Sequence, residues 1–294
     1  MVSLALLSCF GQQDPLYSQY LLNPFIINPA YAGFTKNLTG LVAGRSQWSA
    51  IEGSPTTVNA SLHCALAQNK MGLGFIALKD AIGSNKITEF HAAYAYRIEM
   101  ENKDRISFGL QAGGINYRDD YSALTIDPTD PKFQKNISET TFSIGAGIIY
   151  NSERLLAGIS IPKMLNARSD ATGNGIVPYG QTAYGHLAYI FDLTHQIKMK
   201  PFVMARYMKS VPINADAGGT FTFKDSYTLG LFTRNLHTFG LLAKLNIGDI
   251  LRVGYVFELP TGKSVGANFT AHEITIGIQM KIFKQHELFS VEDF

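Results

Sequence analysis

The sequence of 294 residues has few charged residues, only two cysteines and one tryptophan. Charged residues make up 16% of the chain, its formal net charge is +2, and its Lys and Arg residues are scattered singly. A nucleic-acid-binding surface is therefore not expected, because such a surface needs clustered cations to neutralise phosphates. Cys9 and Cys64 cannot build a disulfide framework, and a metal cluster on them is not expected either.

Long hydrophobic runs are also missing, which limits how the chain can meet a membrane. The N-terminus has a short apolar run, MVSLALLSCFG, followed by the polar residues QQDP. This pattern predicts an export signal over residues 1–11. Residues 6–9 (LLSC) form a loose lipobox, so lipidation of Cys9 is an open alternative. No other stretch approaches the roughly 20 apolar residues of a spanning helix, so an exported chain of this kind is either soluble or spans as a β-barrel.

From residue 38 onward the hydrophobic pattern has a period of two, which is typical of β-strands. Near the end of the chain, for example, Ile274, Ile276 and Ile278 alternate with Glu273 and Thr275. Fourteen such runs lie near residues 38–48, 56–66, 71–79, 88–98, 104–116, 140–150, 154–161, 182–193, 196–207, 213–223, 226–234, 238–247, 250–258 and 271–283. One face of each run is polar and rich in small residues, with the apolar exceptions Ile76, Leu78 and Leu242.

The connections between these runs alternate in length. Short turns are expected at residues 67–70, 99–103, 151–153, 194–195, 224–225 and 248–249. Longer loops are expected at residues 49–55, 80–87, 117–139, 162–181 and 259–270, while the loops at 208–212 and 235–237 break the trend by being short. An even number of antiparallel strands with tight turns at one end and long loops at the other is typical of a bacterial outer-membrane barrel.

The sequence therefore predicts an all-β fold, a transmembrane antiparallel β-barrel of about 14 strands over residues 38–283. A non-strand segment over residues 12–37 precedes the barrel, and a periplasmic tail over residues 284–294 follows it. A soluble β-sandwich or propeller is the alternative, but its strands tend to be shorter and would carry charges on the face that is apolar here. The expected location is the bacterial outer membrane, which the chain crosses many times.

The segment NPFIINPAYAG does not fit the strand pattern. Pro24 and Pro29 fix their own φ and push the preceding asparagines out of the helical region, so neither a long helix nor a central strand is expected. A lumen of about fourteen strands is open unless something occupies it, so we expect this segment to line the periplasmic mouth or to enter the lumen. Charges on the predicted lumen faces then form an ion path, hold the inserted segment, or belong to a hydrated wall with no specific ligand, and the sequence does not separate these three readings. They are Arg45, Arg97, Arg105, Arg206, Arg234, Arg252, Glu89, Glu258 and Glu273.

No motif indicates catalysis. The segment GISIP around Ser160 lacks the second glycine of a nucleophile elbow, and the His-Glu pairs at residues 272–273 and 286–287 lack the second histidine of a zinc motif. A lipid-modifying enzyme would need a Ser/His/acid set at the membrane rim, and none is evident. The sequence therefore predicts a non-enzymatic protein with no catalytic residue, metal ligand or cofactor.

Several segments are similar to those of a known family. They are QDPLYSQYLLNPFIINPAYAG at 13–33, RSQW at 45–48, PTT at 55–57, GLG at 72–74, AGISIPKMLN at 157–166, GYVFEL at 254–259 and AHEITIGI at 271–278. Together they resemble the PorP/SprF family, membrane proteins associated with the type IX secretion system of Bacteroidota. The leader departs from the family pattern because it is short and lacks an early Lys or Arg, and the distal loops are too generic to carry over a particular client.

The resemblance implies a non-enzymatic outer-membrane component of the type IX secretion or gliding machinery. Such a protein supports export or surface attachment of a secreted adhesin or C-terminal-domain cargo, and its expected partners are outer-membrane lipid, that cargo and periplasmic secretion subunits. The alternative is an outer-membrane diffusion channel or a transporter of hydrophobic compounds. The residues expected to bind a partner or to plug the barrel are Tyr20, Asn23, Pro24, Asn28, Pro29, Ala30, Tyr31, Gly33, Arg45 and Trp48.

Overall fold

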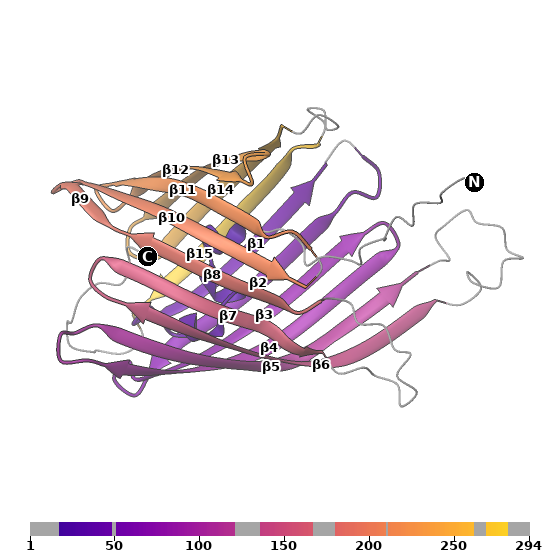
Figure 1. Ribbon diagram of the computed structural model, residues 1–294, viewed down its shortest axis with the longest axis horizontal. Helices are drawn as coiled ribbons and strands as arrows, with labels where there is room; N and C mark the ends of the chain where they lie inside the picture. Colours follow the sequence, from indigo (N-terminus) through magenta and orange to yellow (C-terminus); the bar gives the residue numbers. More distant parts are fainter. Residues whose placement is uncertain are drawn as a thin grey trace, which may run out of the picture.

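The computed structural model describes residues 18–48, 51–120, 136–166, 180–209, 211–261 and 269–281. Within them one antiparallel sheet curls into a barrel around three short 3-10 helices (Figure 1). The helices are η1 (Gln19–Leu21), η2 (Pro24–Ile26) and η3 (Pro29–Tyr31). The strands are β1 (Leu38–Gln47), β2 (Thr56–Leu66), β3 (Met71–Ile82), β4 (Asn85–Glu99), β5 (Arg105–Asp119), β6 (Ile137–Asn151), β7 (Leu155–Asn166), β8 (Thr182–Tyr189), β9 (Phe191–Thr194), β10 (Ile197–Met208), β11 (Asn214–Phe223), β12 (Tyr227–Arg234), β13 (Thr238–Ile247), β14 (Leu251–Pro260) and β15 (Ala271–Met280).

The sheet closes on itself. Nearly every strand pairs with its neighbours in sequence, and the ring is completed where β1 pairs with β15 along its full length, so fourteen strands plus the short extra strand β9 form the barrel. The predicted antiparallel barrel with a non-strand N-terminal segment is confirmed. Closure gives each of the fourteen main strands a partner on both sides, as a barrel in lipid requires.

The predicted strand over residues 182–193 is interrupted. Its two parts, β8 and β9, both pair with β10, and Ile190 lies between them with its backbone N–H donating to the Arg154 carbonyl at 2.8 Å. The register places Pro201 of β10 opposite Tyr189, at the interruption. Proline has no N–H for the ladder, which accounts for the break.

The predicted loop over residues 80–87 is wrong. β3 continues to Ile82 and β4 begins at Asn85, so only two residues, Gly83 and Ser84, connect them. The polar residues around this turn resemble a loop in sequence, but the alternation persists through it. Asp80 points inward, where its carboxylate accepts a hydrogen bond from Thr57 of β2.

The two faces of the sheet have opposite character. Large apolar side chains point outward, among them Phe90 with 63% of its surface exposed, whereas Glu273 on the inner face is fully buried. This arrangement suits lipid outside and a polar lumen inside, as the alternation predicted. A hollow of about 870 Å³ on the outer face lies where the small residues Ala60 and Ala92 meet Phe75. Among the described residues, no helix is long and apolar enough to cross a membrane.

The two ends of the barrel also differ. The turns after β2, β4, β6, β11 and β13 lie at one end, here called the short-turn end, where β1 begins and β15 ends. The strands β1, β5, β7 and β14 end at the other end of the barrel, here called the long-loop end because the longer predicted loops follow these strands. In the usual orientation of such barrels the short-turn end faces the periplasm. Residues 121–135 and 167–179 of the predicted loops, the predicted export signal over 1–11 with Cys9, and the predicted tail over 284–294 lie outside the described residues.

Candidate functional site

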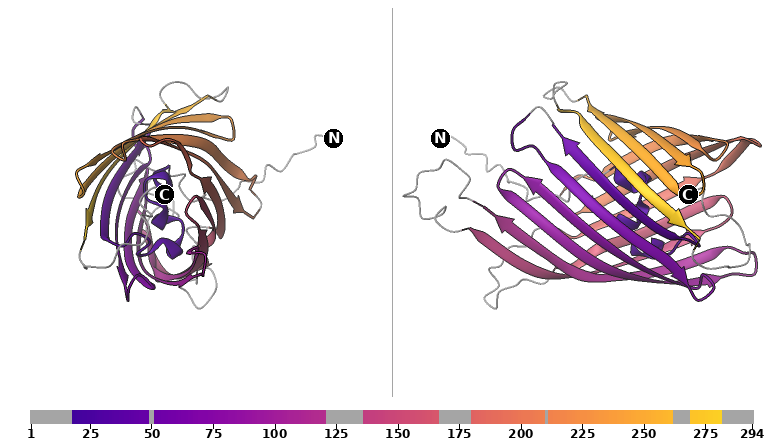
Figure 2. Two further views of the ribbon diagram at one scale, coloured as in Figure 1. Left: turned by 90° about the vertical axis from the view of Figure 1, so that its left-hand side faces the viewer. Right: turned by 180° about the vertical axis from the view of Figure 1, so that it is seen from behind.

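Residues 18–37, here called the lumen segment, lie inside the barrel and carry the three 3-10 helices (indigo in Figures 1 and 2). Ser18 contacts Glu258 and Glu273, which lie near the long-loop ends of β14 and β15. Ala32 contacts Arg97, near the short-turn end of β4. The segment therefore runs through the lumen from the long-loop half to the short-turn end, where β1 begins.

The two Asn-Pro pairs shape this path. Asn23 and Asn28 have φ of −141° and −144°, and the proline after each one starts a 3-10 helix, where its missing N–H costs nothing. The Asn28 side-chain oxygen accepts from the Ala30 N–H at 3.0 Å and caps η3. The prolines thus break the segment into short turns that fit inside the barrel, in agreement with the expectation that it is neither a long helix nor a strand.

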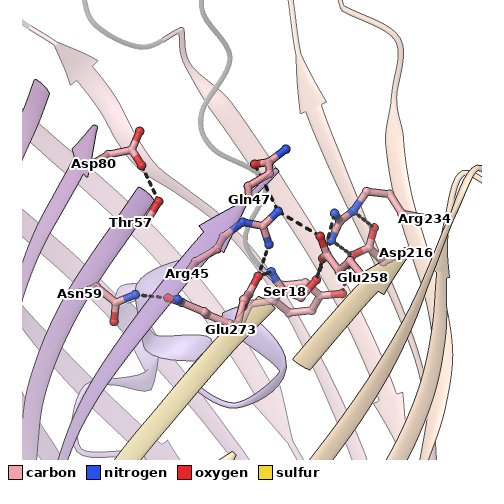
Figure 3. Close-up of polar contacts among 12 residues, drawn as sticks. Ser18, Arg45, Gln47, Thr57, Asn59, Asp80, Asp216, Arg234, Glu258 and Glu273 are labelled. Carbon is pink, nitrogen blue, oxygen red and sulfur yellow. Dashed lines mark hydrogen bonds and ion pairs between the residues drawn. The ribbon is translucent and has the colours of Figure 1, made fainter. Parts of the chain in front are cut away.

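A buried group of charged side chains surrounds the start of the segment (Figure 3). This group, the charge cluster, consists of Arg45, Asp216, Arg234, Glu258 and Glu273 from five different strands. Arg45 pairs with Glu258 at 3.0 Å and also with Glu273. Arg234 pairs with Asp216 at 2.9 Å and with Glu258 at 3.2 Å. All five side chains are at most 6% exposed.

The lumen segment completes this cluster. The Ser18 N–H donates to Glu273 at 3.1 Å, its hydroxyl donates to Glu258 and accepts from Arg234 at 2.9 Å, and the Tyr20 hydroxyl donates to Asp216 at 2.8 Å. Three carboxylates face two guanidinium groups, so donors from the segment offset an excess negative charge. Burial and the neighbouring Asp216 raise the pKa of Tyr20 well above its ordinary value, which keeps this donor protonated.

Apolar packing fixes the middle of the segment. Phe25 is 1% exposed and packs in one cluster with Tyr31 and Phe34 of the segment and with Ile76 and Leu242 of the wall. Ile76 and Leu242 are two of the apolar exceptions on the polar lumen faces. Their position explains the exceptions, because they meet the segment and not water.

At the short-turn end the segment lies directly on the barrel backbone. The Ser107 hydroxyl donates to the Ala30 carbonyl at 2.9 Å, and Arg97 donates to the Ala32 carbonyl. At Gly72 and Gly109 a Cβ would overlap the backbone of Ala32 and Ala30, so only glycine allows this approach. The segment is therefore seated by both polar and steric complementarity.

Two further contacts hold the segment to β7 and β8. The Ser160 hydroxyl of β7 donates to the Ile27 carbonyl at 2.7 Å. The Tyr31 hydroxyl lies 3.0 Å from Nε2 of His186 on β8, and the two rings stack with centroids 5.6 Å apart. The Ser160 side chain thus serves as a hydrogen-bond donor to the backbone of the segment.

The structure brings together all but one of the residues predicted to bind a partner or to plug the barrel. Tyr20, Asn23, Pro24, Asn28, Pro29, Ala30, Tyr31 and Gly33 lie in the lumen segment, and Arg45 faces its start. Trp48 lies apart from them, at the long-loop end of β1. Its backbone N–H donates to the Thr270 carbonyl at 2.9 Å, and its ring packs edge-on against Phe269 with the ring centroids 5.7 Å apart.

The predicted lumen charges divide between different sites. Arg97, Arg234, Glu258 and Glu273 touch the segment, as the preceding contacts show, and Arg45 holds Glu258 and Glu273 in place beside it. Glu89 instead pairs with Lys163 at 2.9 Å and with His91 at 3.1 Å, in a separate buried group. Sequence reasoning missed Ser18 and Asp216, although Asp216 occupies an inward position in the alternation of β11. Among the described residues, no group of three His, Cys, Asp or Glu residues could hold a metal ion.

Comparisons with solved structures place the fold among outer-membrane barrels. The CymD monoaromatic hydrocarbon channel aligns with a TM-score of 0.54 at 11% identity, over 94% of this chain and 96% of that one. A TodX monoaromatic hydrocarbon channel mutant aligns with a TM-score of 0.51 at 9% identity, over 88% and 94% of the two chains. A Pseudomonas aeruginosa FadL homologue aligns with a TM-score of 0.50 at 8% identity, over 87% and 93%. At these identities the likeness concerns the fold alone.

No curated protein matches the chain. One protein family, however, matches most of its sequence. Residues 9–278 match the family described as "Type IX secretion system membrane protein PorP/SprF". The matched range contains the whole lumen segment and all the strands, except for the last two residues of β15. The chain is therefore a membrane β-barrel of the outer-membrane type and belongs to the PorP/SprF family of type IX secretion system membrane proteins.

Proposed function

We propose that this protein is a non-enzymatic scaffold of the type IX secretion and gliding machinery in the outer membrane. It supports the export or surface attachment of a secreted adhesin or C-terminal-domain cargo, and it contacts periplasmic secretion subunits. The observation that carries the proposal is that the lumen segment fills the barrel. A barrel filled by its own chain is suited to holding a position in the membrane more than to passing solutes.

The contacts of the lumen segment support a closed resting state. Ser18, Asn28 and Ala30 are fully buried, and the polar groups of the segment bond to strands on several sides of the barrel. Opening a wide path would break these bonds, at about 0.5–1.5 kcal/mol for each, and would separate the charge cluster from the donors of the segment. We therefore assign residues 18–37 of the predicted segment to a plug in the lumen, in preference to a segment that lies in the periplasm.

The burial of the lumen segment also limits which of its residues a partner can contact. Asn23, Asn28, Pro29 and Tyr31 are at most 6% exposed, so a partner cannot reach them while the segment stays in place. We propose that these residues hold the plug and that partners bind the ends of the barrel. The short-turn end would then meet the periplasmic subunits and the long-loop end would meet cargo.

The alternative function is a channel for solutes or hydrophobic compounds. The fold resembles barrels described as monoaromatic hydrocarbon channels. The sequence identity to them is 11% or less, so this resemblance does not favour the channel over the scaffold. Such an activity would require the lumen segment to move aside.

Affinity purification from native outer membranes tests the proposal. A C-terminally tagged wild-type protein, solubilised in mild detergent, is expected to recover a large secreted adhesin or periplasmic secretion subunits. The matched control is a tagged outer-membrane barrel of another family at equal abundance, which should recover neither. A protein that comes out alone and carries ions or solutes in planar bilayers would overturn the scaffold in favour of the channel.

A further inference from the structure

Strand β9 has a free edge at the short-turn end of the barrel. It pairs with β10, and among the described residues no strand pairs with its other side. The neighbour of β8 on that side is β7, but β7 begins at Leu155, opposite Tyr189, so β9 extends past it. The turn after β9 lies beside the turn after β11, where the Lys224 N–H donates to the Gln196 carbonyl at 2.8 Å (left in Figure 1). In the usual orientation this end faces the periplasm.

The backbone groups of this edge are open to a partner. The Ile190 N–H points to the β7 side, where it donates to the Arg154 carbonyl at 2.8 Å. Along a strand the N–H and C=O groups of every second residue point to the same side, so those of Asp192 also point away from β10. Among the described residues, none bonds to these two groups from that side. An N–H and a C=O presented by one residue are the groups that the facing residue of an antiparallel strand binds.

The side chains of β9 are exposed on both faces. Phe191 and Leu193 continue the outward set of Tyr189, with 46% and 53% of their surfaces exposed. The rings of Tyr189 and Phe191 pack with their centroids 4.7 Å apart. Asp192 lies on the opposite face, where its carboxylate makes an exposed pair with Arg154 at 3.2 Å. Exposed apolar side chains beside a free strand edge are typical of an interaction site.

The chemistry of the edge defines its partner. An extended strand supplies the alternating backbone groups that the edge lacks, whereas a helix satisfies its own. Apolar residues on either side of the one that faces Asp192 would cover Phe191 and Leu193, and a basic residue suits the position opposite Asp192. A second copy of this chain is disfavoured, because two β9 edges paired around Asp192 would place two aspartates directly opposite each other.

We propose that the free edge of β9 binds an extended apolar–basic–apolar segment of a periplasmic protein by strand addition. The segment lies antiparallel to β9, in the position that β7 would occupy if it began earlier. Its central residue exchanges two hydrogen bonds with the backbone of Asp192. The proposal rests on the proposed function in one respect, which is that the periplasmic protein is a secretion subunit.

A peptide titration of the purified barrel in detergent tests the edge without any secretion subunit. The probe is the fluorescein-labelled peptide Thr-Val-Lys-Val-Thr, followed by fluorescence anisotropy. Two comparison peptides replace its lysine by glutamate, which repels Asp192, or by proline, which lacks the N–H. The lysine peptide is expected to saturate one site and to bind at least about tenfold more tightly than either comparison. It should also slow hydrogen exchange at the Asp192 N–H of the wild type.

A proline variant of the barrel removes the edge donor. D192P lacks the N–H that points away from β10, so the pairing of β9 with β10 is kept, and binding of the lysine peptide should weaken about tenfold. D192N keeps the N–H and should bind within about threefold of the wild type. The matched control is E101P, at the second position of the turn closed by the Lys103 N–H and the Met100 carbonyl at 2.9 Å, where proline is favoured. It should bind like the wild type.

The outcomes separate the edge from the proposed function. Because D192P could fail to fold, the three peptides on the wild type give a separate reading. Equal binding of the three peptides, equal binding by folded D192P and the wild type, or no saturable binding would each overturn the edge. In the affinity purification, tagged D192P should recover at least about fivefold less of the periplasmic subunits than tagged E101P. A wild type that binds the lysine peptide but recovers no secretion subunit would support the edge and overturn the proposed function.

Discussion

Replacing Arg234 by methionine should release the start of the lumen segment. The Arg234 guanidinium donates to Asp216 at 2.9 Å and to the Ser18 hydroxyl at 2.9 Å, and it pairs with Glu258 at 3.2 Å. Methionine keeps much of the apolar stem but removes every one of these interactions. Three carboxylates would then face Arg45 alone, and Ser18 would lose one of its two side-chain contacts.

The size of the effect follows from burial. Removing one partner from a buried ion pair costs about 3–5 kcal/mol, because the other charge stays buried without compensation. The Asp216 side chain is 1% exposed and, among the described residues, keeps only the hydrogen bond from the Tyr20 hydroxyl, whereas Glu258 keeps its pair with Arg45. We therefore expect R234M to lower the free energy of unfolding by about 3–5 kcal/mol.

Urea unfolding in lipid vesicles, followed by the fraction of folded barrel, measures this loss. The matched control is R154Q, which breaks the pair between Arg154 and Asp192 at 3.2 Å, whose side chains are 52% and 48% exposed. An exposed pair contributes about 0–1 kcal/mol. The double variant R234M/D216L removes both charges of a pair and should recover part of the stability. If R234M unfolds at the same urea concentration as R154Q, the charge cluster does not hold the segment and the reasoning fails.

Three further predictions concern the segment itself. Y20F should cost about 1.5–3 kcal/mol and Y31F about 0.5–1.5 kcal/mol in the same assay, because Tyr20 bonds to a carboxylate and Tyr31 to an imidazole; equal costs would contradict the assignment. G109V should destabilise the barrel by about 1–3 kcal/mol, since a side chain there overlaps the backbone of Ala30; G185A, whose methyl meets nothing within 4 Å, is the control and should be neutral. Because burial raises the pKa of Tyr20, the folded protein keeps a proton that the unfolded chain releases above pH about 10, so stability is full below that pH and falls above it. The fall, measured by urea unfolding at a series of pH values, should be shallower in Y20F than in the wild type, and parallel curves would refute this.

Much of the barrel could be predicted because alternation is a local property. The inward set that contains Glu273 and the outward set that contains Ile274 follow from a period of two, and both are as predicted. The same pattern marked Ile76 and Leu242 as exceptions, which was the available signal for a lumen filled by protein. It could not show what filled it.

Other features depend on register and on distant contacts. Asp216 and Arg234 lie opposite each other on β11 and β12, but their meeting with Glu258 and Ser18 requires the closure of the whole barrel. The β3–β4 turn was missed because polar residues such as Asp80 resemble a loop, although Asp80 is satisfied inside by Thr57. The direction of the lumen segment, from the long-loop half to the short-turn end, also has no local signal.

The conductance of single barrels in planar bilayers shows directly whether residues 18–37 close the lumen. We expect no steady conductance for the wild type, and open-state conductance for the variant that lacks residues 14–34. R234M provides an intermediate case, with intermittent openings. A wild-type barrel that conducts steadily, at the same level as the deletion variant, would contradict the claim that the segment is a plug.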